Sequence, residues 1–184
     1  MAYIKTSCGR YDYKGFQMER LSVKRKRDLN EIYCRIFKGS MPELYADENV
    51  DPETYYRSYV DTYLQRDIRD LVQVADEMQF YNFMTIVAAQ TSKPVVYEEL
   101  ASAAGISAPT AKKWLSVLVS SHIIALVQPY HNNALKRVVK MPLIHFLDTG
   151  LAAYLLKWGN PEATGKEGPW SGAFFESLCF FGDL

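Results

Sequence analysis

Residues 107–116 combine small polar and basic side chains that suit non-covalent contacts with a nucleic acid. If this segment is a helix, they share its outer side, away from the apolar residues between them. Small hydroxyl side chains fit closely into a major groove, and lysines suit the phosphates beside it. The candidate DNA-binding residues of this helix are Ser107, Thr110, Lys112, Lys113 and Ser116.

Two short helices, predicted over residues 96–104 and 107–120, would position these side chains. Ala101 is small where two such helices cross closely, Gly105 can adopt the left-handed conformation of the turn, and Ile106 plugs the space between the helices. Apolar residues fill the inner side of both helices: Leu100, Ala104, Ala111, Trp114, Leu115 and Leu118. This pattern predicts a helix-turn-helix.

A β-hairpin is predicted directly after the two helices, with strands over residues 123–130 and 137–146 and a turn at 131–133. It would complete a winged helix-turn-helix, and its basic residues Lys136, Arg137 and Lys140 would contact phosphate beside the groove. Many winged helices bind protein instead, and the second helix has no arginine for a bidentate contact with guanine. DNA binding and docking on a protein therefore both stay open.

No catalytic motif stands out in the chain. The nearest approach to a phosphate-binding loop, residues 159–167, has five residues between its glycines and ends in glutamate where a hydroxyl is needed. The three histidines and three cysteines lack the spacing of metal ligands. We therefore expect a chain that is not an enzyme and that holds no metal or cofactor.

Further helices are predicted over residues 24–37, 51–72, 76–91 and 149–158, where apolar residues recur at a spacing of three and four, and another begins at Gly172. Tyrosines in the second of these could form a base-stacking platform, but at helical spacing we expect them in a core. The predicted fold class is mainly α with a small β-hairpin, a helical bundle plus a winged helix-turn-helix. Its parts are a basic and helical segment (1–50), a helical region (51–158) with the winged helix at about 78–147, and a linker with a first further helix (159–184).

Charge is balanced overall, with 21 basic and 21 acidic residues, but it is unevenly placed. Residues 1–30 carry a net charge of +5, residues 41–77 carry −7 and residues 93–147 carry +4. Because salt screens such fields within about 10 Å, the last window could still attract phosphate locally. The longest apolar run is too short to cross a bilayer, and the first residues do not resemble a signal peptide, so we expect a cytoplasmic protein with no membrane partner.

Four stretches of the chain together resemble one family. They are FKGSMPELY (37–45), residues 55–84, the helix-turn-helix, and FLDTGLAAYLL (146–156) followed by SGAFFESL (171–178). In order and spacing they are similar to bacterial and archaeal AAA-type ATPases whose C-terminal part is a domain of unknown function. The resemblance covers the chain from about residue 29 to its end.

The resemblance implies a P-loop ATPase core before this region, of which residues 1–50 would be the tail end. It also implies a restriction-endonuclease-like domain after this region, of which residues 159–184 would be the linker and the first helix. ATP and Mg²⁺ are implied only for that absent core, and the core itself, DNA or a second copy of the chain are the partners expected. Whether Met1 and Leu184 are natural ends stays open. The positions that match the family without an assigned role are Arg66, Asp67, Asp148, Gly150 and Glu176. Asp148 also suits the cap of the helix that follows it, and Arg66 suits a salt bridge with a nearby aspartate.

Overall fold

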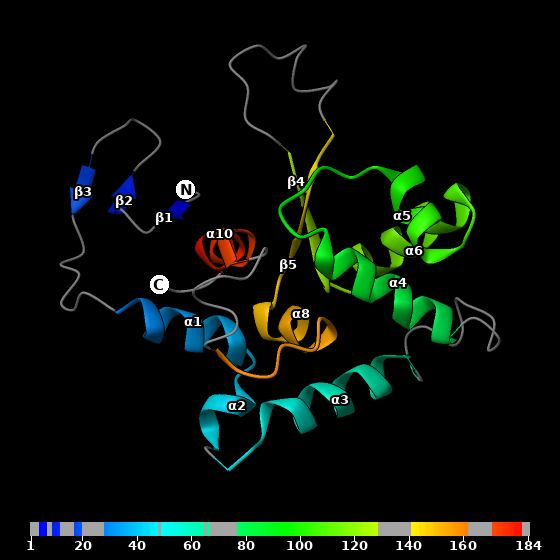
Figure 1. The fold of residues 1–184 in the computed structure, drawn as a ribbon. Helices are drawn as coiled ribbons and strands as arrows, with labels where there is room; N and C mark the ends of the chain where they lie inside the picture. Colours follow the sequence, from blue (N-terminus) through cyan, green and yellow to red (C-terminus); the bar gives the residue numbers. More distant parts are fainter. Residues whose placement is uncertain are drawn as a thin grey trace.

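The computed structural model describes residues 4–6, 9–11, 17–19, 28–47, 49–64, 66, 77–128, 141–161 and 171–181. These residues are mainly helical, as the sequence predicted (Figure 1). The helices are α1 (Leu29–Lys38), α2 (Glu43–Ala46), α3 (Pro52–Tyr63), α4 (Glu77–Ala89), α5 (Tyr97–Ala104), α6 (Ala108–Ser120), α8 (Thr149–Leu155) and α10 (Ser171–Phe181). The strands are β1 (Ile4–Thr6), β2 (Gly9–Tyr11), β3 (Gln17–Glu19), β4 (Ile124–Val127) and β5 (Leu143–Phe146).

Helix α8 lies at the centre of the fold and contacts α1, α3, α4, β5 and α10 (Figure 1). It can be surrounded in this way because several of its residues are small, so that neighbouring backbones come close. Gly150, Ala152 and Ala153 are all buried. The core therefore forms around a short helix with large aromatic side chains supplied by its neighbours, such as Tyr56 and Phe80.

Local end signals place most helices where the sequence predicted them. Gly39 follows α1 with a φ of 78°, and Asp51 caps α3 by accepting a hydrogen bond of 2.9 Å from the Thr54 N–H. The basic residues 24–27, predicted to begin α1, lie outside the described residues, as do residues 65 and 67–72 of the helix predicted over 51–72. Some ends differ, since α4 ends at Ala89 rather than at residue 91 and α8 ends at Leu155 rather than near residue 158.

The tyrosines of α3 pack inward as expected. Tyr56 and Tyr63 are buried, and Tyr55 and Tyr59 are half-buried against the core. Side chains that fill a core cannot stack on bases, so the described part of α3 offers no platform of four tyrosines.

Strands β4 and β5 form the predicted antiparallel pair, with Ile124 opposite Phe146 and Val127 opposite Leu143. Its far end, residues 129–140, lies outside the described residues. A second antiparallel sheet in the order β1-β2-β3 is a difference from the prediction, which named only a basic and helical segment for residues 1–50. Strands of three residues give too few alternations for a period of two to be recognised in the sequence. Within the described residues, no helix has the length and apolar character needed to cross a membrane.

Candidate nucleic-acid interface

The turn between α5 and α6 has the geometry that its sequence predicted. Gly105 is left-handed, with a φ of 66°, and the Ile106 N–H closes α5 by donating to the Ala101 carbonyl at 3.0 Å. Ser107 then caps α6, because its Oγ accepts a hydrogen bond of 3.2 Å from the Thr110 N–H. The two helices are therefore held in a fixed relation by a short turn with satisfied backbone groups.

The inner face of α6 is anchored on α4 through Trp114. Its ring meets the ring of Phe80 at a centroid distance of 5.3 Å and that of Phe83 at 5.5 Å, with interplanar angles of 69° and 70°. Edge-to-face pairs of this kind are favourable beyond the apolar area that they bury. Ala101 and Leu118 are buried in the same core cluster as Trp114, so the inner face of α6 belongs to the core.

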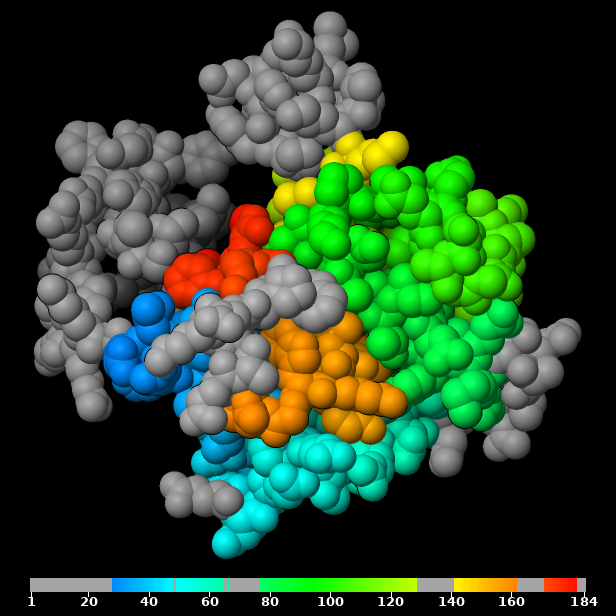
Figure 2. All heavy atoms as spheres, in the orientation of Figure 1, coloured from blue at the N-terminus to red at the C-terminus, as the bar shows by residue number. Residues whose placement is uncertain are grey.

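The outer face of α6 carries the residues predicted to bind DNA. Ser107, Lys112, Lys113 and Ser116 are exposed, and Thr110 is half-buried. Neither lysine forms an ion pair with another residue in the described ranges. The helix lies at the edge of the molecule, and the green segment that contains it is on the visible surface (Figure 2). The structure thus brings these five predicted residues together on one accessible face.

Two details of this face go beyond the prediction. The hydroxyls of Ser107 and Thr110 lie 2.7 Å apart and share a hydrogen bond, which leaves them less free to read bases. Glu98 and Glu99 are exposed in the first turn of α5, so acidic groups are present on the neighbouring helix. The predicted wing residues Lys136, Arg137 and Lys140 lie outside the described residues.

A second group of predicted positions forms a buried polar junction around Asp148. As predicted, Asp148 caps α8, accepting a hydrogen bond of 2.7 Å from the Leu151 N–H. Its carboxylate also accepts bonds from the Ser40 N–H at 2.7 Å, the Ser40 hydroxyl at 2.8 Å and the Tyr56 hydroxyl at 2.7 Å. Burial, and then the charge of Asp148, raise the pKa of Tyr56, so this tyrosine stays a protonated donor.

Two glycines make room for this junction. A Cβ on Gly150 would lie 2.8 Å from both the Cα and the N of Gly39, and it would also collide with the Tyr56 hydroxyl. Sequence reasoning marked Gly150 but missed Gly39, Ser40 and Tyr56 as its partners. The FKGS stretch within the resemblance contains Gly39 and Ser40, and the stretch 55–84 contains Tyr56, so the resemblance was the signal that could have found them. The geometry ties α1, α3 and α8 together, and this structural role accounts for both Asp148 and Gly150.

The remaining family positions do not join either group. Arg66 and Glu176 are exposed, and Asp67 lies outside the described residues. Glu176 lies on α10 near His145. Burial lowers the pKa of His145, and the negative charge of Glu176 opposes this shift. Among the described residues, no three or more His, Cys, Asp or Glu side chains gather as metal ligands would.

Comparison with known proteins identifies the region without assigning an activity. An uncharacterized protein of Mycobacterium tuberculosis and one of Mycobacterium bovis are each 27% identical over 145 residues, which cover 77% of this chain and 33% of theirs. The chain therefore spans about a third of the length of the curated relatives it matches. No solved structure matches it.

The model of one family, described as a domain of unknown function (DUF8612), matches residues 29–162. These residues run from the start of α1 to just beyond α8, so they include the helix-turn-helix pattern and the Asp148 junction. The match confirms the part of the resemblance that concerned a domain of unknown function. Since it covers well over half of the sequence, the chain belongs to the DUF8612 family.

Proposed function

We propose that this region binds duplex DNA through the outer face of α6, as the winged helix-turn-helix of a longer protein. The single observation that carries the proposal is the division of α6 into two faces. Its inner face is fixed on α4 by Trp114, and its outer face presents Lys112 and Lys113, both exposed. No acidic residue occurs between Ser107 and Ser120.

The chemistry of this face favours phosphate over base recognition. Lysines supply positive charge at the edges of a groove, and small side chains such as Ser116 let the helix approach closely. A bidentate contact with guanine would need an arginine or a well-placed lysine, and the shared hydrogen bond of Ser107 and Thr110 occupies two hydroxyls. We therefore expect binding with little sequence preference and a strong dependence on salt.

The region itself is proposed to be non-catalytic. Because the curated relatives are about three times as long as the matched segment, other parts of a longer protein would supply any activity. The resemblance to AAA-type ATPases suggests that these parts are an ATPase core, which would use ATP and Mg²⁺, and a nuclease-like domain. In that arrangement the winged helix would hold DNA while the core hydrolyses ATP.

The test is fluorescence anisotropy of a labelled duplex of about 20 base pairs, titrated with the whole chain at several salt concentrations. The variant Lys112→Ala/Lys113→Ala should lower the slope of log affinity against log salt by about 2, because each lysine–phosphate contact contributes about 0.9. The matched control is Arg57→Gln/Lys157→Gln, which also removes two positive charges, from α3 and from the segment after α8. The control should keep the slope of the unmodified chain.

Two results would contradict the proposal. One is the absence of any complex at low salt. The other is an equal loss of affinity in both double variants, which would mean that net charge alone attracts the DNA and that α6 has no special part in it.

A protein-docking function is the second candidate, and the exposed pair Glu98 and Glu99 on α5 favours it. These carboxylates would repel phosphates next to the proposed DNA face, whereas a basic protein surface would complement them. Under this function the partner would be the ATPase core or a second copy of the chain. Detection of a dimer by light scattering, together with no binding of DNA at low salt, would support docking on a protein instead of DNA binding.

A further inference from the structure

A pocket of about 430 Å³ opens between the beginning of α3 and the end of α8, away from the proposed DNA face. Its walls also include Phe37 of α1 and Tyr81 of α4, so four helices contribute to it. The volume falls in the range of about 300–1,000 Å³ that is typical of small-molecule sites. Neither the DNA proposal nor the family match assigns anything to this pocket.

Aromatic rings give the pocket flat apolar walls. Tyr81, Tyr154 and Trp158 line it and are each only partly buried, so some of their surface remains open. Their positions are fixed from behind, because Tyr154 stacks on the buried ring of Tyr56 at a centroid distance of 6.2 Å and Trp158 packs on Phe174 at 4.4 Å. Rings held in this way favour a ligand that is itself flat and aromatic.

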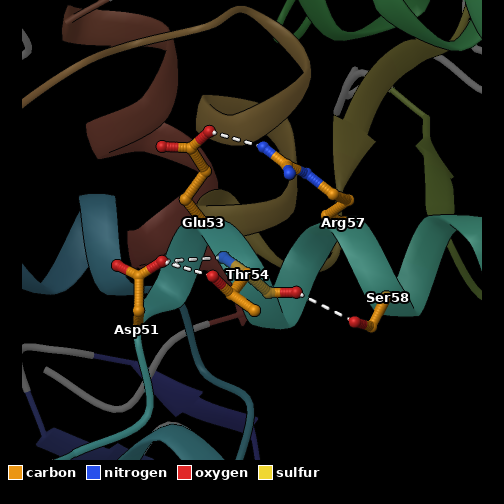
Figure 3. A network of polar contacts seen from close by, with 5 residues as sticks. All are labelled: Asp51, Glu53, Thr54, Arg57 and Ser58. Atoms are coloured by element: carbon orange, nitrogen blue, oxygen red, sulfur yellow. Dashed lines mark hydrogen bonds and ion pairs between the residues drawn. The ribbon is translucent and has the colours of Figure 1, made fainter.

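One cation at the pocket is easily available to a ligand. Arg57 donates to Glu53 at 3.1 Å one helical turn away, and both side chains are mostly exposed, at 63% and 70% (Figure 3). Exposed pairs of this kind contribute little to stability, so the guanidinium can exchange its partner at small cost. Figure 3 shows that Glu53 and Arg57 project from one side of α3, whereas Thr54 and Ser58 hydrogen-bond on another.

A second cation is held at the pocket by an unusual backbone conformation. Lys157 has a φ of 55°, in the left-handed region where glycine normally ends a helix. Its N–H donates to the Tyr154 carbonyl at 3.0 Å, and the Trp158 N–H donates to the Ala153 carbonyl at 3.1 Å, so the turn closes α8 in the usual way. Only the residue type is unusual, because a side chain is disfavoured there. Lys157 is exposed and lines the pocket, and strain of this kind is commonly kept for function.

From these observations we propose that the pocket binds a small aromatic carboxylate. Its ring would lie against Tyr154 and Trp158, and its carboxylate would take the two cations Lys157 and Arg57. Glu53 would then compete with the ligand for Arg57. The proposal does not rest on DNA binding, since none of these residues belongs to α6.

Naphthalene-2-carboxylate is a suitable probe, measured by isothermal titration calorimetry with the whole chain. We expect a dissociation constant of about 1 mM or tighter, with the neutral naphthalene-2-carboxamide at least about fivefold weaker. Lys157→Gly should weaken carboxylate binding about fivefold while keeping or raising the melting temperature, because glycine relieves the left-handed strain. Glu53→Gln should tighten binding about threefold, because it removes the hydrogen-bonded partner of Arg57 and one of the two carboxylates, Asp51 and Glu53, that line the pocket and would repel the ligand.

The opposite response of these two variants distinguishes a ligand site from a purely structural turn. Equal affinities for the carboxylate and the carboxamide would overturn the proposal. So would unchanged carboxylate binding in Lys157→Gly or in Glu53→Gln, or no saturable binding of the probe to the unmodified chain.

Discussion

Replacing Asp148 with asparagine should destabilise the fold strongly, although the two side chains have nearly the same size and shape. One carboxylate oxygen of Asp148 accepts from the Tyr56 hydroxyl and the Leu151 N–H, and the other accepts twice from Ser40. Asp148 as a whole residue is only 6% exposed, so water does not readily replace a lost partner.

The size of the effect follows from these four bonds. Asparagine keeps one acceptor oxygen and turns an NH₂ group toward the other two donors. The Ser40 hydroxyl can rotate to accept, but its N–H loses an acceptor, and the remaining bonds lose their charge. Hydrogen bonds to a charged group are worth about 1.5–3 kcal/mol each, so a total loss of about 3 kcal/mol is expected. For a domain of this size it lowers the melting temperature by about 9 °C.

The assay is urea unfolding followed by circular dichroism, with Asp51→Asn as the matched control. Asp51 also caps a helix, through the Thr54 N–H, but it is exposed. Asparagine caps a helix about as well as aspartate, so the control should change the free energy of unfolding by less than about 0.5 kcal/mol. If Asp148→Asn were no more destabilising than the control, the junction would not hold α1, α3 and α8 together.

Two further predictions concern stability. Gly150→Ala should lower the free energy of unfolding in urea by about 3 kcal/mol, because its Cβ would meet the backbone of Gly39. Gly172→Ala, whose Cβ would meet open space, should be neutral or stabilising, and equal effects of the two variants would contradict the close approach of Gly150 to Gly39. Burial lowers the pKa of His145 below the 6.5 of the unfolded chain, so the unfolded state binds a proton first as the pH falls. The free energy of unfolding should therefore decrease as the pH falls through 6.5 toward the folded pKa, and His145→Gln should make this pH dependence weaker. If the pH dependence of the His145→Gln variant were equally steep, a group other than His145 would cause it.

Local signals made the helices α5 and α6 and the turn between them predictable. Gly105, Ser107 and the inward position of Trp114 each act within a few residues of the chain, and the structure places all three as expected. The cap of α8 by Asp148 was predictable for the same reason, because it spans only three residues.

The other bonds of Asp148 join residues 108 and 92 positions apart, and no pattern within one helix can report them. The left-handed conformation of Lys157 was not predicted, because a lysine gives no signal of a left-handed turn and the helical spacing of apolar residues continues to Trp158. The short strands β1, β2 and β3 were missed because pairing between strands decides them, and their own alternation is too brief to show it.

The proposed binding of DNA on the outer face of α6 can be tested by amide chemical shifts in ¹H–¹⁵N NMR. On addition of a short duplex at low salt, we expect the largest shift changes between Ser107 and Ser116, with little change at Glu53 and Arg57. Saturable binding with shift changes confined to α3 and α8, and none along α6, would contradict it.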